Sequence, residues 1–200
     1  MGGNALMILG LTGKYCAGKS TAARFLIDQG WYHIDVDKIG HVQLNEQAEA
    51  IARGFGSRIL NNDGTVNRPA LGKIVFNDPA RLRSLELLLH PAMVEAVKAE
   101  AREADAEAVL IDAALLFHME LDTLCDQVLI ITAPAWLRFL RGRSRDKLTL
   151  REFLRRNAAQ KNIVSQASLS QVDIKRVSNW GCRARLHRAI ERNTWIGTDY

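Results

Sequence analysis

Residues 6 to 21 read LMILGLTGKYCAGKST, and this stretch decides the fold that the sequence predicts. A nearly continuous apolar run, typical of a strand buried on both faces of a parallel sheet, breaks at Gly10 to Gly13 and gives way to a glycine-bounded loop. A helix-like segment then begins at Lys19. The pattern is that of a phosphate-binding loop, G-x-x-x-x-G-K-[ST]. Its four defining positions are filled by Gly13, Gly18, Lys19 and Ser20.

This loop predicts that the chain binds the phosphates of ATP. The two glycines let the backbone turn tightly with its N–H groups pointing inward, and the positive end of the next helix faces the same anion. We expect the Lys19 ammonium to reach the β- and γ-phosphates and the Ser20 hydroxyl to ligate Mg²⁺. A chance match is expected in under roughly 1% of chains this long. The residues predicted to contact the nucleotide are Gly13, Lys14, Tyr15, Cys16, Ala17, Gly18, Lys19, Ser20 and Thr21.

Length and composition limit the classes of protein to which the chain could belong. The chain has 200 residues, of which 48% are hydrophobic and 24% are charged, which suits one α/β domain with an inserted or appended part. No apolar run approaches the roughly 18 residues of a membrane span, and no basic leader with a cleavage site precedes the first strand. We expect a cytoplasmic monomer that contacts neither a membrane nor nucleic acid. The unevenly spaced cysteines indicate neither a disulfide framework nor a zinc site.

Two carboxylates follow a second short strand. Residues 31–36, WYHIDV, are predicted to form this strand, with Asp35 and Asp37 at its carboxyl end. Open parallel sheets bind ligands at that end of their strands. If the strand continues, a spacing of two places both side chains on one face, where either could approach the phosphates. Capping of a helix that starts near Lys38 is the structural alternative. We favour a role in catalysis or metal binding for the pair.

From residue 38 to residue 106 the pattern becomes almost wholly helical. Short amphipathic helices are expected over 70–76 and 80–89, and a longer one from His90-Pro91 through Ala104. We interpret this block, which is too large for a simple crossover between strands, as an inserted lobe that holds the second substrate. The nucleotide-binding core then comprises residues 1–37 and 107–200. Candidate substrate contacts in the lobe are Arg68, Arg81 and His90, each of which a capping or solvated position would also explain.

Further strands complete the predicted core. Val109 to Asp112 is an apolar run that ends in a carboxylate, and Asp112 is a candidate for holding Mg²⁺ through water. Residues 127–132, QVLIIT, form the most hydrophobic strand. A last short strand is expected over 175–178 and a closing helix over 182–195. Together with the loop, these elements predict an α/β fold in which a P-loop NTPase-like parallel sheet is flanked by helices.

An arginine-rich hairpin follows the most hydrophobic strand. Residues 138–160 contain seven arginines, and the excess behind the net charge of +5 is concentrated there. The capping box Thr149-Leu150-Arg151-Glu152 predicts a new helix from Thr149, so that residues 142–148 form the turn. A charge run is usually a solvated face. Beside a phosphate loop, however, we interpret residues 139–160 as a lid, because the planar arginine fork binds phosphate oxygens in pairs.

The order of these motifs resembles the dephospho-CoA kinase family. The similarity runs from about residue 7 to residue 181, and its most distinctive mark is a His-Pro pair in the helical lobe. The matching residues are Leu11 to Gly13 and Gly18 to Thr21 in the nucleotide loop; Ile34 to Asp37 in the I-D-x-D motif; Arg68, Leu71, Val75, Phe76, Leu85, Glu86 and His90-Pro91 in the lobe; Asp112 with Leu115 to Phe117; Arg141, Arg145, Asp146, Thr149, Glu152, Arg156 and Gln160 in the lid; and Asn179 with Gly181 on the adenine side.

The resemblance implies an enzyme that transfers a phosphoryl group from MgATP to the ribose 3′-hydroxyl of dephospho-CoA, a small-molecule substrate. It implies that Asp37 accepts the hydroxyl proton, while Asp35 fixes the geometry or the metal. Lys19 and the lid arginines are then expected to stabilise charge on the transferring group. The lid arginines concerned are Arg141 and Arg145, the adenine-side residue is Asn179, and Leu115 is expected on the acceptor side.

Two other functions stay open for the sequence: a P-loop kinase with another small-molecule acceptor, and a nucleotide-binding regulatory module without turnover. The insert with its His90-Pro91 pair argues against the first, and Asp37 together with the lid arginines argues against the second. The chain also departs from the family. Lys14-Tyr15-Cys16 replaces a more glycine-rich loop interior, and Ala114 and His118 stand where the family has Pro and Glu.

Overall fold

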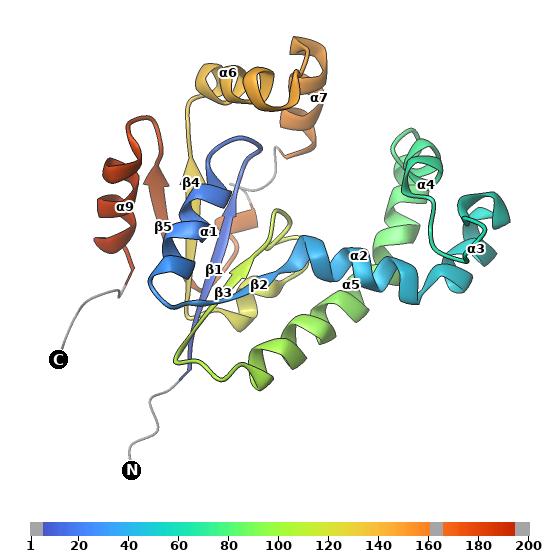
Figure 1. The fold of residues 1–200 in the computed structure, drawn as a ribbon, viewed down its shortest axis with the longest axis horizontal. Coiled ribbons are helices and arrows are strands. Elements are labelled where there is room, and N and C mark those ends of the chain that lie inside the picture. Colours follow the sequence, from blue (N-terminus) through green and yellow to red (C-terminus); the bar gives the residue numbers. More distant parts are fainter. Residues whose placement is uncertain (1–5, 161–165, 195–200) are drawn as a thin grey trace. The chain divides into compact units, whose positions relative to one another are not determined.

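The computed structural model describes residues 6–160 and 166–194, which form two compact bodies. The first body comprises Met1–Ile34 and Glu103–Tyr200, and the second comprises Asp35–Arg102. A five-stranded sheet has the order β2-β3-β1-β4-β5, and β1 pairs in parallel with both β3 and β4 (Figure 1). The strands are β1 (Met7–Gly13), β2 (Tyr32–Asp35), β3 (Ala108–Asp112), β4 (Gln127–Thr132) and β5 (Asp173–Ser178).

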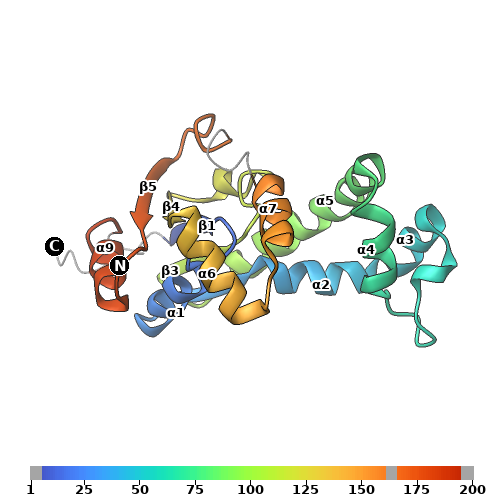
Figure 2. The ribbon, with the colours of Figure 1, turned by 90° about the horizontal axis from the view of Figure 1, so that it is seen from above.

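The helices of the first body follow from its hydrophobic pattern. Helices α1 and α9 bury their apolar stripes against the same face of the sheet, where Leu26, Leu186 and Ile190 share one core with Leu129. Helices α6 and α7 pair as a hairpin, which Figure 2 shows from above. The expected α/β fold, a parallel sheet flanked by helices, is confirmed. The helices are α1 (Lys19–Asp28), α6 (Ala135–Asp146), α7 (Leu150–Ala159) and α9 (Arg183–Glu191).

The second body is helical and has a core of its own. Apolar side chains from each of its helices, among them Leu44, Ile51, Leu71 and Leu89, form one buried cluster. The helices are α2 (Val36–Glu46), α3 (Ala48–Phe55), α4 (Arg68–Val75) and α5 (Pro79–Glu103). A 3-10 turn at Ser57–Ile59 lies between α3 and α4. No helix within residues 6–160 and 166–194 is both long and apolar enough to cross a membrane.

Helix α5 corrects the expectation of two helices separated at His90-Pro91. The structure has one helix of 25 residues with Pro91 in its interior. Proline removes one backbone hydrogen bond from a helix and usually ends or kinks it. Here the apolar stripe is continuous on both sides of the proline, with Leu85 and Leu89 before it and Val97 and Ala101 after it, all buried. Burial of that stripe outweighs the lost hydrogen bond.

The α6–α7 hairpin has a shorter turn than residues 142–148. Helix α6 continues to Asp146, and Lys147 ends it in the left-handed conformation, with φ 52°. The predicted capping box is confirmed: the Thr149 hydroxyl accepts from the Glu152 backbone N–H, and the Glu152 carboxylate accepts from the Thr149 N–H. Gly142 is buried inside α6, and Leu148 is buried directly after the helix, so the turn is confined to the residues between Asp146 and Leu150.

Candidate functional site

The phosphate loop joins β1 to α1 at the carboxyl end of the central strand. Its first glycine, Gly13, lies so close to β4 that an added Cβ would be 2.6 Å from the Ile131 carbonyl oxygen. Gly18 has φ +106°, a left-handed conformation, and its Cα faces the Asn179 side chain too closely for any Cβ. The backbone therefore requires glycine at both positions of the pattern. Ser20, in the first turn of α1, is exposed.

Lys19 and Asp112 meet at the base of this loop. The Lys19 ammonium forms an ion pair with the Asp112 carboxylate at the end of β3, and both side chains are largely buried. The pairing follows from the sheet, because Leu11 of β1 lies in register with Asp112 of β3. The two residues that the sequence assigned to phosphate and metal binding are thus brought together by the neighbouring strands.

A third group at this point is His33, which the sequence analysis did not select. Its Nε2 lies 3.5 Å from Oδ2 of Asp112 and is buried, with no hydrogen-bond partner in the described part of the chain. Burial opposes ionisation of Asp112, but His33 and the Lys19 ammonium outweigh it, so that the pKa of the Asp112 carboxyl is lowered. Asp112 is an ionised carboxylate at neutral pH.

These groups are compatible with Mg²⁺ held together with phosphate oxygens. Within residues 6–160 and 166–194, no cluster of three or more His, Cys, Asp or Glu side chains could hold a metal by itself. Mg²⁺ is commonly bound through one or two protein oxygens together with substrate phosphates and water. The exposed Ser20 hydroxyl and the ionised Asp112 carboxylate are oxygen ligands of that kind.

Arg141 and Asn179 stabilise the loop through hydrogen bonds to its backbone carbonyl oxygens. Arg141 donates from Nη1 to the Ala17 carbonyl oxygen at 3.2 Å and from Nη2 to the Asn179 carbonyl oxygen at 3.0 Å. The buried Asn179 amide donates to the same Ala17 oxygen at 2.8 Å. Arg141 thus joins the α6–α7 hairpin to the loop and to the end of β5. Asn179 lies beside the loop, as a residue on the nucleotide side would.

The arginines of the α6–α7 hairpin differ from one another. Arg138 is buried, and it donates to the Asn157 Oδ1 at 2.7 Å and to the Ala133 carbonyl oxygen at 3.2 Å. Burial lowers its pKa, and its hydrogen bonds tie the two helices together. Arg145 is exposed and pairs with Asp146, where Nη2 lies 2.9 Å from Oδ2. Arg138 therefore supports the hairpin, while Arg145 presents charge at its surface.

The two carboxylates after β2 lie in the second body and have different surroundings. The strand ends at Asp35 and helix α2 begins at Val36, so the two side chains do not share a strand face as they would in a longer strand. Asp35 caps α2, because its side chain accepts from the Lys38 N–H at 3.2 Å. Asp37 is exposed in the first turn and forms no hydrogen bond or ion pair within residues 35–102 as described. The capping alternative is thereby correct for Asp35.

The other candidate substrate contacts divide between the bodies. In the second body, Arg68 is exposed at the start of α4, Arg81 pairs with Asp78 at 3.6 Å, and His90 is half-buried within α5. In the first body, Leu115 is exposed in the turn after β3. None of these observations identifies a ligand, so their assignment stays a prediction.

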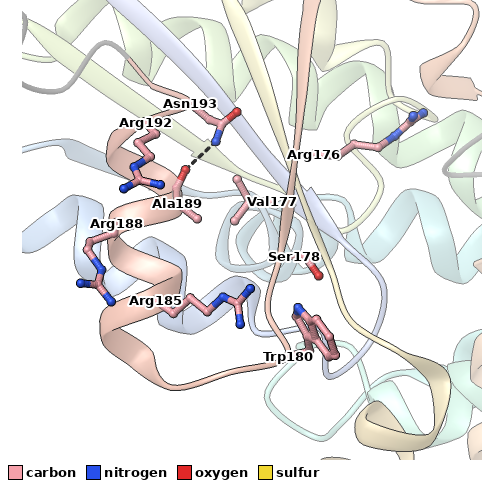
Figure 3. A pocket seen from close by; sticks show the side chains of 9 residues that line it. All are labelled: Arg176, Val177, Ser178, Trp180, Arg185, Arg188, Ala189, Arg192 and Asn193. Atoms are coloured by element: carbon pink, nitrogen blue, oxygen red, sulfur yellow. Dashed lines mark hydrogen bonds between the residues drawn. The ribbon is translucent and has the colours of Figure 1, made fainter.

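A separate pocket of about 520 Å³ lies beside β5 and α9. Four of its lining residues are arginines: Arg176, Arg185, Arg188 and Arg192. Figure 3 shows that their guanidinium groups do not converge, since Arg176 extends away from α9 while Arg188 and Arg192 extend from the helix. The exposed Trp180 lies at one end, with Arg185 over its ring at 5.5 Å. The pocket therefore lacks the focused geometry of the phosphate loop.

Comparison with known proteins identifies the family. The family model for dephospho-CoA kinase matches residues 7–179. The dephospho-CoA kinase of Moorella thermoacetica is 40% identical over 162 residues, which cover 78% of this chain and 76% of that protein. That of Lactobacillus acidophilus is 32% identical over 191 residues, covering 92% and 94%. That of Borreliella burgdorferi is 37% identical over 134 residues, and the match spans 66% of this chain and 65% of the relative's length, just under two thirds.

Solved structures agree with this result. A protein of Thermus thermophilus aligns with a TM-score of 0.80 at 28% identity, covering 94% of this chain and 96% of that one. The dephospho-CoA kinase of Campylobacter jejuni aligns with a TM-score of 0.62 at 25% identity, covering 92% and 94%. A shikimate kinase of Bacteroides thetaiotaomicron, with a TM-score of 0.53 at 16% identity, shares the fold. This chain belongs to the dephospho-CoA kinase family.

Proposed function

We propose that this chain transfers the γ-phosphoryl group of ATP to the ribose 3′-hydroxyl of dephospho-CoA, which gives coenzyme A and ADP. Family membership supports the reaction, because the matched relatives carry that activity in their names. The observation that carries the proposal is the constellation at the end of β1. There, a phosphate loop with its lysine beside the Asp112 carboxylate lies next to an arginine-bearing hairpin.

Phosphoryl transfer passes through a loose, in-line transition state, so the protein acts mainly by positioning and charge stabilisation. We assign the Lys19 ammonium to the β- and γ-phosphates, and Arg145 to the charge on the transferring group. Arg141 keeps the loop in its binding conformation through the carbonyl oxygens that it already contacts. When bound, Mg²⁺ would supply positive charge that stabilises the phosphates, and Ser20 and Asp112 are the residues that would hold it.

We assign the acceptor side to the second body. Asp37, exposed in the first turn of α2 and without a competing partner in residues 35–102 as described, is our candidate for accepting the proton of the 3′-hydroxyl. Asp35 orients that turn through its cap. Contacts with the acceptor are assigned to Arg68, Arg81 and His90 of this body, and also to Leu115 of the first body. We further propose that the enzyme acts as a monomer in the cytoplasm.

The proposal is tested by measuring ATP consumption with dephospho-CoA, nucleosides, nucleotides or shikimate as the acceptor. We expect turnover with dephospho-CoA that requires Mg²⁺ and is at least about 100-fold faster than with the others, because a site built for one acceptor rejects those that leave its polar groups unpaired. Comparable rates with a nucleoside or nucleotide would make the chain a different P-loop kinase. ATP binding with no turnover would make it a regulatory module.

The role of Asp37 has its own test. Asp37→Asn should lower kcat by about 100-fold or more, since a general base typically contributes about 10² to 10⁴. Affinity for ATP should stay within about threefold, because the phosphate loop keeps its Lys19 and its backbone donors. Asp28→Asn, at an exposed carboxylate that ends α1, is the matched control and should retain the parent rate. A near-normal kcat for Asp37→Asn would remove this residue from the role.

A further inference from the structure

Tyr15 occupies the interior of the phosphate loop, and its contacts lie on the α6–α7 hairpin. Its hydroxyl donates to the Asp146 carboxylate at the end of α6. Its backbone N–H donates to the Gln160 side-chain oxygen at 2.7 Å, and its carbonyl oxygen accepts from Arg138 at 3.4 Å. One residue of the loop therefore contacts the start of α6, its end, and the residue that follows α7.

The Tyr15 ring also lies beneath two arginines. The guanidinium carbon of Arg156 is 4.7 Å from the ring centroid and that of Arg145 is 5.5 Å from it, within the range of cation–π attraction. Gly142 permits this approach, since a Cβ there would already lie 3.2 Å from the ring. The ring thus attracts a pair of positive charges to the loop that holds the triphosphate.

The contact with the Tyr15 ring leaves N–H donors of Arg145 and Arg156 available for other hydrogen bonds. A guanidinium that contacts an aromatic ring by cation–π attraction keeps its N–H donors for other partners. Across residues 6–160 and 166–194, Arg156 forms no side-chain hydrogen bond, and Arg145 donates from Nε and Nη2 to Asp146, which leaves its Nη1. The remaining donors can meet phosphate oxygens.

Asp146 links the tyrosine to Arg145. Its carboxylate accepts from Arg145 at 2.9 and 3.0 Å and from the Tyr15 hydroxyl. These hydrogen bonds, first that of Arg145 and then that of Tyr15, lower the pKa of Asp146 to about 2. Burial and the bond to Asp146 raise the pKa of Tyr15 to about 12, so its hydroxyl stays a donor at neutral pH. The tyrosine orients Asp146, and Asp146 orients Arg145.

We propose that Tyr15 is a positioning residue for phosphoryl transfer: it seats Arg145 and Arg156 over the phosphate loop before the nucleotide binds. The tyrosine acts through the arginines and does not itself contact the reacting atoms. The inference rests on the proposed phosphotransfer, which the parent rate with dephospho-CoA tests separately.

The kinetic test compares Tyr15→Phe, which keeps the ring, with Tyr15→Leu, which keeps only an apolar side chain. We expect kcat to fall about tenfold in the first and about 50-fold in the second, because the first loses one charge-assisted hydrogen bond and the second also loses the cation–π contacts. The Kd of an ATP analogue should change by less than about threefold, since the backbone donors of the loop are retained. Ser144→Ala, which removes a hydroxyl from an exposed position of α6, is the control and should match the parent.

A double-mutant cycle tests whether Tyr15 acts through Asp146. If it does, the effect of Tyr15→Phe on kcat should largely disappear in an Asp146→Asn background. Equal effects in both backgrounds would overturn the proposal. So would a kcat within twofold of the parent for Tyr15→Leu, or a proportional change in kcat and nucleotide Kd, which a merely structural role would produce. If Tyr15→Leu does not fold, the kcat of Tyr15→Phe and the double-mutant cycle with Asp146→Asn decide whether the proposal holds.

Amide hydrogen exchange gives a readout that needs no turnover. In the parent without nucleotide, residues 136–158 should exchange more slowly than in Tyr15→Leu, and an ATP analogue should reduce the difference. Exchange that is identical in both proteins would contradict the proposal even in an active enzyme. A parent that shows the exchange difference but no turnover would contradict the proposed function alone.

Discussion

At the scale of single residues, Lys19 and Asp112 form a largely buried ion pair. Their side chains are only 18% and 10% exposed, so each charge has lost most of its hydration and depends on the other. In the proposed reaction, a triphosphate that binds Lys19 would replace this partner. A bound divalent cation would then balance the charge of the Asp112 carboxylate.

The ion pair predicts a pH dependence of stability. Folding lowers the pKa of Asp112 below the ordinary value of 3.8, so its contribution is fully present above about pH 4 and is lost as the pH falls through the lower folded value. In Asp112→Asn we expect a lower free energy of unfolding than in the parent at pH 6, and a smaller difference below pH 4. Urea unfolding between pH 3 and pH 7 measures it.

Asp28→Asn is the matched control for this series, because Asp28 is exposed at the end of α1. Its unfolding free energy should follow that of the parent across the whole range. If Asp112→Asn differed from the parent by the same amount at pH 3 and pH 7, ionisation of Asp112 would not be the cause.

The sequence predicted Lys19 and Asp112 because a known pattern and a strand end indicate them. It did not select His33, although strand alternation in WYHIDV places His33 and Asp35 on one face. Selecting His33 required knowing that β2 is the neighbour of β3. The same holds for Arg138, which is one of seven arginines within residues 138–160 and is buried in the structure, where it links α6 to α7. Burial depends on tertiary packing, which a charge pattern does not reveal.

At the scale of elements, the capping box of α7 should determine how well the α6–α7 hairpin is ordered. Thr149→Ala removes a side chain that accepts from the helix and donates to Glu152, and loss of an N-cap typically costs about 1 kcal/mol. We expect faster amide exchange in residues 150–156 and a lower kcat. Exchange in α1 should not change.

Ser144→Ala, at an exposed serine in the body of α6, is the control for the cap. It removes a hydroxyl from the same hairpin and should slightly favour the helix, because alanine has the higher helix propensity. Equal exchange in α7 for Thr149→Ala and the parent would show that tertiary contacts, and not the cap, hold the helix.

Elements were predictable where one local signal dominates. The strand Gln127–Thr132 has the bounds that its apolar run indicates, and the capping box starts α7 at the expected place. Pro91 misled because proline usually ends a helix, whereas packing of the surrounding apolar stripe decided the outcome. The strand predicted over residues 31–36 ends one residue early for a related reason: Asp35 caps α2, so Asp37 lies in the first turn of that helix.

At the scale of the molecule, the two bodies have separate cores. Ile51→Ala removes a fully buried side chain from the second body and should cost about 2 to 5 kcal/mol there. We expect a higher KM for dephospho-CoA, while the Kd of a fluorescent ATP analogue stays within about threefold. Leu129→Ala, at an equally buried position of the sheet, should weaken binding of the analogue.

Titration of both variants with both ligands checks this expectation. If Ile51→Ala weakened nucleotide and acceptor binding equally, the two bodies would unfold as one cooperative unit. The assignment of nucleotide binding to the first body and of acceptor binding to the second would then be wrong.

The sequence predicted a helical insert from the change of hydrophobic period near residue 38, but not that its helices would share a single core. That sharing depends on contacts between helices far apart in the chain.

Strand β5 lies at one end of the sheet order and is paired in the sheet with β4. Its other edge offers backbone groups that a strand from a second molecule could join, which is a common start of aggregation. The strand carries Asp173, Lys175 and Arg176, so an approaching copy would meet its own charges. We therefore expect the charges on β5 to disfavour addition of a strand from a second molecule at this edge of the sheet.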